Sequence, residues 1–226
     1  MKNKKISTII SIIVLLVVVG LLGYYFWPKT QPQDQLEKFF EFKIVKTDLT
    51  DWEKDKFTKE FMATKDALRL DPEGFQIWLN LGWVKKAVGD YRGAEEIWLY
   101  VNKTWPLNSV SFNNLGDLYA NFMNEYDKAE AMFKVAIQNS KGEAINWIYV
   151  RSLFDLYVKT NQLDKAENML IESLTSQPDN YDFNILLAGF YRDFGQKEKA
   201  LQYYQKALVI KPDNEVVRKE IEALRK

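Results

Sequence analysis

The sequence predicts an all-α protein in which an α-solenoid of tandem antiparallel helix pairs follows one N-terminal transmembrane helix. Three observations support this expectation. Residues 6–27 carry no charge, sequence features recur at a spacing of 34 residues along the remainder, and aromatic residues make up 15% of the chain. A 34-residue period is typical of repeats built from two helices, and the aromatic content argues against intrinsic disorder.

The uncharged segment, residues 6–27, is the expected transmembrane helix. As a helix it would span roughly 33 Å, which is enough for a bilayer core of about 30 Å. Tyr24, Tyr25 and Trp27 stand at its end, where aromatic rings favour the headgroup layer, and Pro28 would stop the helix. A cleaved signal peptide is the alternative, but its apolar core would run about 7–15 residues and end in small residues. We therefore expect a retained anchor.

The charges that flank this segment predict its orientation. Lys2, Lys4 and Lys5 precede it, and residues 1–29 contain no acidic residue. By the positive-inside rule, residues 1–5 form a cytoplasmic tail and the C-terminal domain lies outside or in the periplasm. The expected location is a single-pass position in a membrane, with the bacterial inner membrane favoured. Residues 28–35 are polar, contain a second proline, and read as a linker.

The rest of the chain repeats itself. Pro72 and Pro106 are 34 residues apart, as are Pro178 and Pro212, and the same spacing separates Tyr157 from Tyr191. This period divides the chain into a degenerate first repeat, residues 36–74, and four clearer repeats, residues 75–108, 109–146, 147–180 and 181–214. A terminal capping helix follows at residues 215–226. No helix pair of this kind buries its apolar face alone, so stacking must supply the core.

The clearest unit, 75–108, carries the pattern W-x2-L-G, then a small residue and a final proline, in Trp78, Leu81, Gly82, Ala94 and Pro106. With these motifs the chain resembles the tetratricopeptide repeat (TPR) family over roughly residues 41–214. This unit and the others depart from the pattern in places. Lys85 stands where tyrosine is usual, one extra residue precedes Ala129, and Phe154 replaces a small residue, where we expect looser packing.

Local signals place the helix ends. Thr50 and Glu53 fit a capping box, which would open a helix whose apolar stripe consists of Phe57, Phe61 and Leu68. Leu36, Phe39, Phe40 and Ile44 suggest a preceding first helix. Residues that tolerate a left-handed conformation, Gly89, Asn161 and Gly195, fall between the two helices of their units.

The resemblance implies that the first helix of each pair lines a concave groove, which would bind a protein or peptide. Asparagine side chains suit this role because they can bond a peptide backbone without reading its sequence. The candidate groove residues are Gln76, Leu79, Trp83, Lys86, Asn113, Asp117, Asn121, Arg151, Asp155, Lys159 and Arg192.

Composition limits the chemistry. The chain has no Cys and no His, so the commonest metal ligands, nucleophile and general base are missing, and it contains no phosphate-binding loop or hydrolase motif. We expect no enzyme activity, no cofactor and no metal site. The part after residue 29 is mildly acidic, which argues against nucleic acid.

The sequence therefore favours a membrane-anchored scaffold or adaptor for a membrane or envelope complex. A structural protein that self-associates and a chaperone-like accessory of protein secretion remain alternatives. An enzyme with a carboxylate site is disfavoured. The oligomeric state and the identity of the partner stay open.

Overall fold

The computed structural model describes residues 36–226, and this part of the chain is helical. The expected tail, transmembrane helix and linker, residues 1–35, lie outside the described residues. Within residues 36–226, no helix combines the length and apolar character needed to cross a bilayer. The elements are η1 (Glu37–Phe39), α3 (Asp51–Leu70), α4 (Phe75–Ala87), α5 (Tyr91–Thr104), α6 (Val110–Leu118), η2 (Tyr119–Met123), α7 (Tyr126–Asn139), α8 (Asn146–Lys159), α9 (Leu163–Ser176), α10 (Tyr181–Asp193), α11 (Lys197–Ile210) and α12 (Glu215–Arg225).

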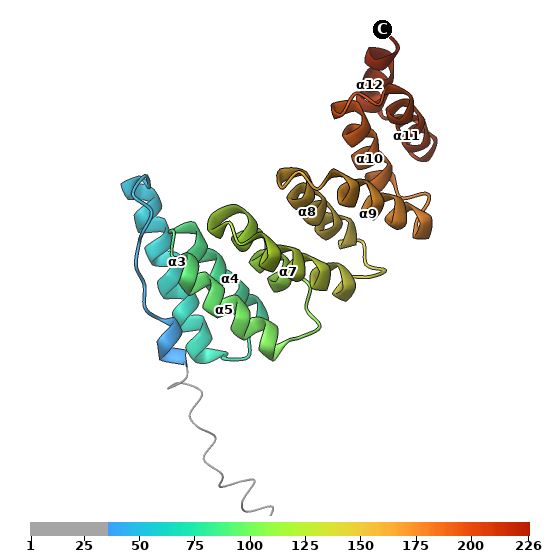
Figure 1. Ribbon diagram of the computed structural model, residues 1–226. Coiled ribbons are helices and arrows are strands. Elements are labelled where there is room, and N and C mark those ends of the chain that lie inside the picture. Colours follow the sequence, from blue (N-terminus) through green and yellow to red (C-terminus); the bar gives the residue numbers. More distant parts are fainter. Residues whose placement is uncertain (1–35) are drawn as a thin grey trace, which may run out of the picture.

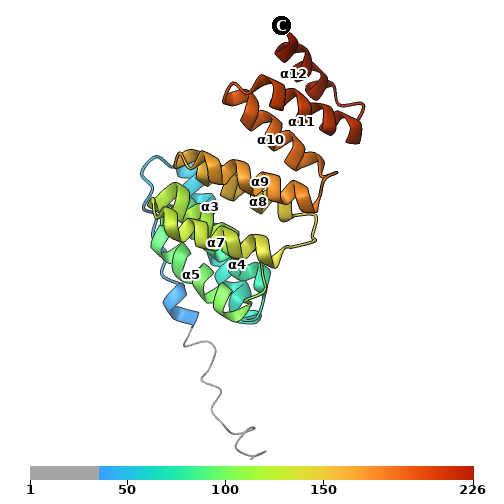
Figure 2. The same cartoon turned by 45° about the vertical axis from the view of Figure 1, so that its right-hand side comes forward.

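Successive helices pack side by side in antiparallel pairs, α4 with α5, α6 with α7, α8 with α9, and α10 with α11 (Figure 1). The pairs stack into an extended array, with η1 at one end and α12 at the other (Figure 2). This arrangement confirms the predicted all-α solenoid for the described residues.

The expected first helix of the degenerate repeat is wrong. Residues 37–39 form a single 3₁₀ turn, and residues 40–50 run without helical structure, as a strap, to the start of α3. Side chains along the strap alternate between partly buried Phe42 and Ile44 and exposed neighbours, which is the two-residue period of an extended chain. The strap is fixed to α4, because the N–H groups of Val45 and Lys46 both donate to the carbonyl of Val88, each at 2.9 Å.

The predicted helix ends are largely confirmed. The Thr50 hydroxyl accepts from the Glu53 N–H while the Glu53 carboxylate accepts from the Thr50 N–H, so the capping box is complete. Gly89, Asn161 and Gly195 all have positive φ, at 84°, 57° and 73°.

The core depends on small residues where two helices cross. Ala94, Ala129, Ala166 and Ala200 are fully buried at equivalent positions of the four second helices. Gly82 has the same function on α4, since a Cβ added there would lie 2.3 Å from Nε1 of Trp98. The bulky Phe154 occupies the corresponding place on α8, and α8 packs less extensively on α9 than the helices of the other three pairs do, as expected.

A recurring hydrogen bond ties each unit to the one before it. The hydroxyl groups of three tyrosines, one in η2 and two on first helices, donate to glutamates on the preceding second helices: Tyr119 to Glu95 at 2.8 Å, Tyr157 to Glu130 at 2.9 Å, and Tyr191 to Glu167 at 2.6 Å. Equivalent positions of consecutive units therefore form the same tyrosine–glutamate hydrogen bond along the array.

Candidate binding groove

A row of polar side chains crosses the first helices of three consecutive pairs. Lys86 on α4 donates to Oδ2 of Asp117 on α6 at 2.7 Å, and the Asn121 amide donates to Oδ1 of the same aspartate at 2.8 Å. Lys159 on α8 donates to Oδ1 of Asn121 at 3.0 Å. We call Lys86, Asp117, Asn121 and Lys159 the polar row. All four were candidate groove residues, and the structure brings them together.

The middle of the polar row is built on an unusual turn. After α6 the chain continues as a π-helical turn, η2, and leaves it through Asn124 with φ 56°. The wider turn takes up the extra residue that the sequence shows before Ala129. Lys159 donates to the carbonyl of Ala120 within this turn at 2.8 Å, which satisfies a backbone acceptor and fixes the turn to α8. Such π turns are frequent at functional sites.

A cavity of about 290 Å³ opens beside the polar row, between α6, η2 and α8. Its walls include Asp117, Asn121, Ser152, Asp155 and Lys159. Ligand pockets for small molecules usually measure about 300–1,000 Å³ and are mostly apolar. This smaller, polar cavity suits a single side chain of a bound segment better than a cofactor.

The charges around the cavity are mixed. Arg151 lies 3.7 Å from Asp155 through its Nε, and both side chains are exposed. Desolvation by the surrounding protein raises the pKa of the Asp155 carboxyl, although the side chain stays exposed, and the Arg151 guanidinium opposes this shift. Lys159 bonds only neutral oxygens in the described structure, so its charge is not neutralised by a close carboxylate. The cavity therefore offers a cation and a carboxylate one helical turn apart on α8.

Exposed aromatic rings accompany the polar row. Trp83 on α4 is 41% exposed and meets Phe57 edge-on, with ring centroids 5.8 Å apart. Phe122 in η2 is also 41% exposed, packs against Tyr91 at 5.0 Å and lies under Nζ of Lys86 at 5.1 Å. Phe122 is not among the groove residues that the sequence predicts, because the π turn is what brings its ring next to Lys86.

The remaining candidates are less favourably placed. Leu79 is 5% exposed and belongs to the core, so its inclusion in the groove is wrong. The guanidinium of Arg192 already forms ion pairs with Asp193, at 2.8 Å, and with Glu220 on α12, at 2.9 Å. Gln76 is exposed at the start of α4, and Asn113 is partly buried with an Oδ1 that finds no donor among the described residues.

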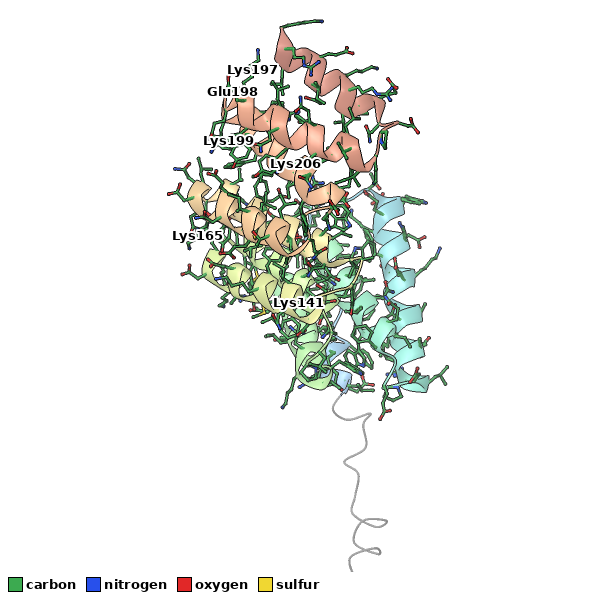
Figure 3. The ribbon with its side chains drawn as sticks, turned by 90° about the vertical axis from the view of Figure 1, so that its right-hand side faces the viewer. Lys141, Lys165, Lys197, Glu198, Lys199 and Lys206 are labelled. Carbon is green, nitrogen blue, oxygen red and sulfur yellow. The ribbon has the colours of Figure 1, made fainter. Side chains whose placement is uncertain are left out.

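The second helices present a different face. Figure 3 shows lysines spread over it, from Lys141 beyond α7 and Lys165 on α9 to Lys199 and Lys206 on α11. A cleft of about 540 Å³ lies between α7, α8 and α9. Two lysines at its rim share the carboxylate of Glu130, at 2.6 Å from Lys134 and 3.8 Å from Lys165. Because these charges already have a partner, this face is the weaker candidate.

The described residues contain no group of three or more His, Cys, Asp or Glu side chains placed to hold a metal ion. The candidate site consists of the hydrogen-bonding groups of the polar row, the charges of Asp155 and Lys159, and the rings of Trp83 and Phe122.

Comparison with known proteins supports the fold. Residues 151–215 match the family model described as tetratricopeptide repeat. No curated protein matches the chain. Among solved structures, PilW, a widely conserved type IV pilus biogenesis factor, is similar with a TM-score of 0.54 and 20% identity over 76% of this chain and 80% of that one.

Two further structures give the same picture. MamA is similar with a TM-score of 0.52 and 20% identity, covering 73% of this chain and 96% of that one. A thermophilic TPR protein from Thermus thermophilus, TTC0263, has a TM-score of 0.53 and 18% identity, covering 76% of this chain and 92% of that one. At these identities the likeness concerns the fold, which is that of a tetratricopeptide-type α-solenoid.

Proposed function

We propose that the chain is a membrane-anchored scaffold or adaptor that binds an extended segment of a partner protein along its first helices. One observation carries the proposal. The polar row joins three consecutive repeats on one face, beside a cavity of about 290 Å³ and two exposed aromatic rings. A surface that combines hydrogen-bonding groups with aromatic anchors has the composition of a protein-binding site.

The binding mode follows from the chemistry of the row. Asn121 and Lys159 offer an amide and an ammonium group that can bond the carbonyls of an extended backbone. Trp83 and Phe122 provide apolar surface for a side chain of the bound segment. The cavity beside Asp155 and Lys159 accepts one polar side chain. A bound segment would thus be held mainly through its backbone, with specificity from one apolar and one polar residue.

The anchor completes the proposal. The uncharged residues 6–27 hold the chain in a membrane, with residues 1–5 in the cytoplasm and the helix pairs on the other side of a bacterial inner membrane. The likeness to PilW, which is named as a pilus biogenesis factor, supports a place in an envelope complex. Protease added to intact cells, with the outer layers made permeable, should digest the helix pairs and spare the N-terminus.

The test of the groove compares partners captured by crosslinking in membranes. Trp83→Ala and Lys159→Met should each lower the yield of crosslinked partner at least about tenfold, which corresponds to ~1.4 kcal/mol. Trp52→Ala and Lys59→Met are matched controls, because Trp52 is 69% exposed on α3 and Lys59 forms an exposed ion pair with Asp55. Equal yields from all four variants would exclude this face as the binding site.

A further inference from the structure

One edge of the array collects its most exposed apolar side chains. Leu70 at the end of α3 is 89% exposed, and Leu107 between α5 and α6 is 83% exposed. These are the highest values among the large apolar side chains of the described residues. Leu70 adjoins the α3–α4 connection and Leu107 lies in the α5–α6 connection, and these two connections lie at the same edge of the first pairs in both views (Figures 1 and 2).

The same edge receives the N-terminal part of the chain. η1 lies against the connection between α3 and α4, since Leu36, Lys38, Phe39, Asp71, Pro72 and Glu73 line one hollow of about 400 Å³. The η1 segment is also tied to α3 by the ion pair of Glu37 and Arg69 at 2.7 Å. The chain therefore enters the array beside Leu70.

The length of the linker limits how far this edge can stand from a membrane. Eight residues, 28–35, separate the uncharged segment from Leu36. Fully extended, they reach at most about 29 Å, which is close to the thickness of a bilayer core. A tether this short keeps the edge at a high effective concentration next to the lipid surface.

The chemistry of the edge fits an interfacial environment. Leu70 and Leu107 can enter the boundary between headgroups and acyl chains, where apolar surface is removed from water. Lys38 and Lys103 flank them, and within residues 36–226 neither lies in an ion pair. Trp105, which contacts Phe75 edge-on at 5.4 Å, fixes the backbone that presents Leu107.

We propose that this edge, comprising η1 and the connections that carry Leu70 and Leu107, rests on the bilayer that holds the chain's own N-terminal segment. The inference depends on the membrane anchor of the proposed function. It adds a second contact with the membrane and fixes the orientation of the array. The first pairs then lie near the lipid, and α10 to α12 extend away from it (Figure 1).

The natural absence of cysteine makes the test direct. Full-length chain with a single Leu70→Cys, Leu107→Cys or Val209→Cys substitution is labelled with a polarity-sensitive fluorophore and reconstituted in phosphatidylcholine–phosphatidylglycerol vesicles containing spin-labelled lipid. Val209 is the matched control, because it is 81% exposed at the end of α11, far from the chain entry. Labels at positions 70 and 107 should shift to the blue and lose at least half their emission, while the label at 209 keeps its spectrum.

The outcomes separate the inference from the function on which it depends. If the chain stays with the vesicles after an alkaline wash but labels 70 and 107 behave like label 209, the edge does not touch lipid and the inference is wrong. If the wash removes the chain, the anchor itself is wrong. A blue shift that grows with protein concentration but shows no lipid quenching indicates contact between two copies, and also overturns the inference.

Discussion

Lys85 occupies the position that a tyrosine takes in each of the three following units. Its side chain is 4% exposed, and Nζ donates to the carbonyl of Glu41 at 2.6 Å and to Oδ2 of Asp90 at 3.0 Å. The preceding second helix, α3, carries Phe61 rather than a glutamate at the equivalent place, so a tyrosine here would lack the acceptor that the other three have. The lysine instead reaches the strap, which takes the place of the expected first helix. This departure from the repeat pattern is thus explained by the partner that the residue meets.

Replacing Lys85 should destabilise the first unit. Lys85→Met leaves the strap carbonyl of Glu41 without its donor and Asp90 without its nearest cation, in a buried place where breaking an ion pair costs about 3–5 kcal/mol. We expect a loss of about 3 kcal/mol in the free energy of unfolding, at the lower end of that range, because Lys43 still lies 3.7 Å from Asp90. Urea unfolding followed by circular dichroism measures it.

The control for this prediction is Lys59→Met. Lys59 and Asp55 form an ion pair at 2.7 Å with both side chains exposed, and such pairs contribute about 0–1 kcal/mol. Similar losses for the two variants would show that the buried pair has no special weight.

At the scale of elements, the spacing between paired helices is set by single small residues. Gly82 on α4 faces Trp98 on α5, whose indole is 1% exposed and donates to the carbonyl of Leu79 at 3.4 Å. An added Cβ at Gly82 would overlap this ring. Gly189 on α10 differs, since a Cβ there would have Oη of Tyr204, at 4.0 Å, as its nearest neighbour.

Alanine at these two glycines should therefore have opposite effects. Gly82→Ala forces α4 and α5 apart and should lower the free energy of unfolding by about 1–3 kcal/mol. Gly189→Ala removes the entropy cost of a glycine inside a helix and should raise it by about 0.5–1 kcal/mol. Chemical denaturation of both variants measures the two changes in the free energy of unfolding. A more stable Gly82→Ala variant would contradict the close packing of α4 at Gly82 against Trp98.

Elements differ in how well the sequence predicts them. Helix pairs follow from the 34-residue period, and the capping box at Thr50 from its own motif. The strap was missed because Leu36, Phe39 and Phe40 have helical spacing, although the alternation around Phe42 and Ile44 indicates an extended chain. The sequence indicates the π turn only through one extra residue before Ala129. The spacing of the repeats does not predict which turn of the helix accommodates that residue. Leu79 was assigned to the groove by counting positions, which cannot separate an edge of the core from an open surface.

At the scale of the whole molecule, ionisation affects stability at both ends of the pH range. The Tyr191 hydrogen bond lowers the pKa of Glu167, and the Lys134 hydrogen bond does the same for Glu130. Their stabilisation is lost as pH falls through those lowered values. Burial, together with hydrogen bonds to glutamate, raises the pKa of Tyr157 and Tyr191. Their stabilisation is complete below the pKa of free tyrosine, about 10, and is lost as pH rises further.

We predict a plateau of stability between about pH 5.5 and pH 9.5, because the chain lacks His and Cys, which titrate in that range. The free energy of unfolding should fall on both sides of the plateau. Tyr191→Phe should weaken the alkaline fall, since the phenylalanine has no proton to lose. Unfolding measured across about pH 3–11 tests this, and a step near the ordinary histidine value of about pH 6.5 would contradict it.

The strap also determines how mechanical load would travel through the molecule. Any tension between an attachment at the N-terminus and a partner held along the first helices must pass through residues 40–50. The strap is fastened by the Lys85 ammonium, which donates to the Glu41 carbonyl, and by two backbone bonds to Val88, and Phe39 just before it packs against Trp78 at 5.1 Å. A pull on the N-terminus therefore loads α4 directly, so the unit that contributes Trp83 and Lys86 bears the force first.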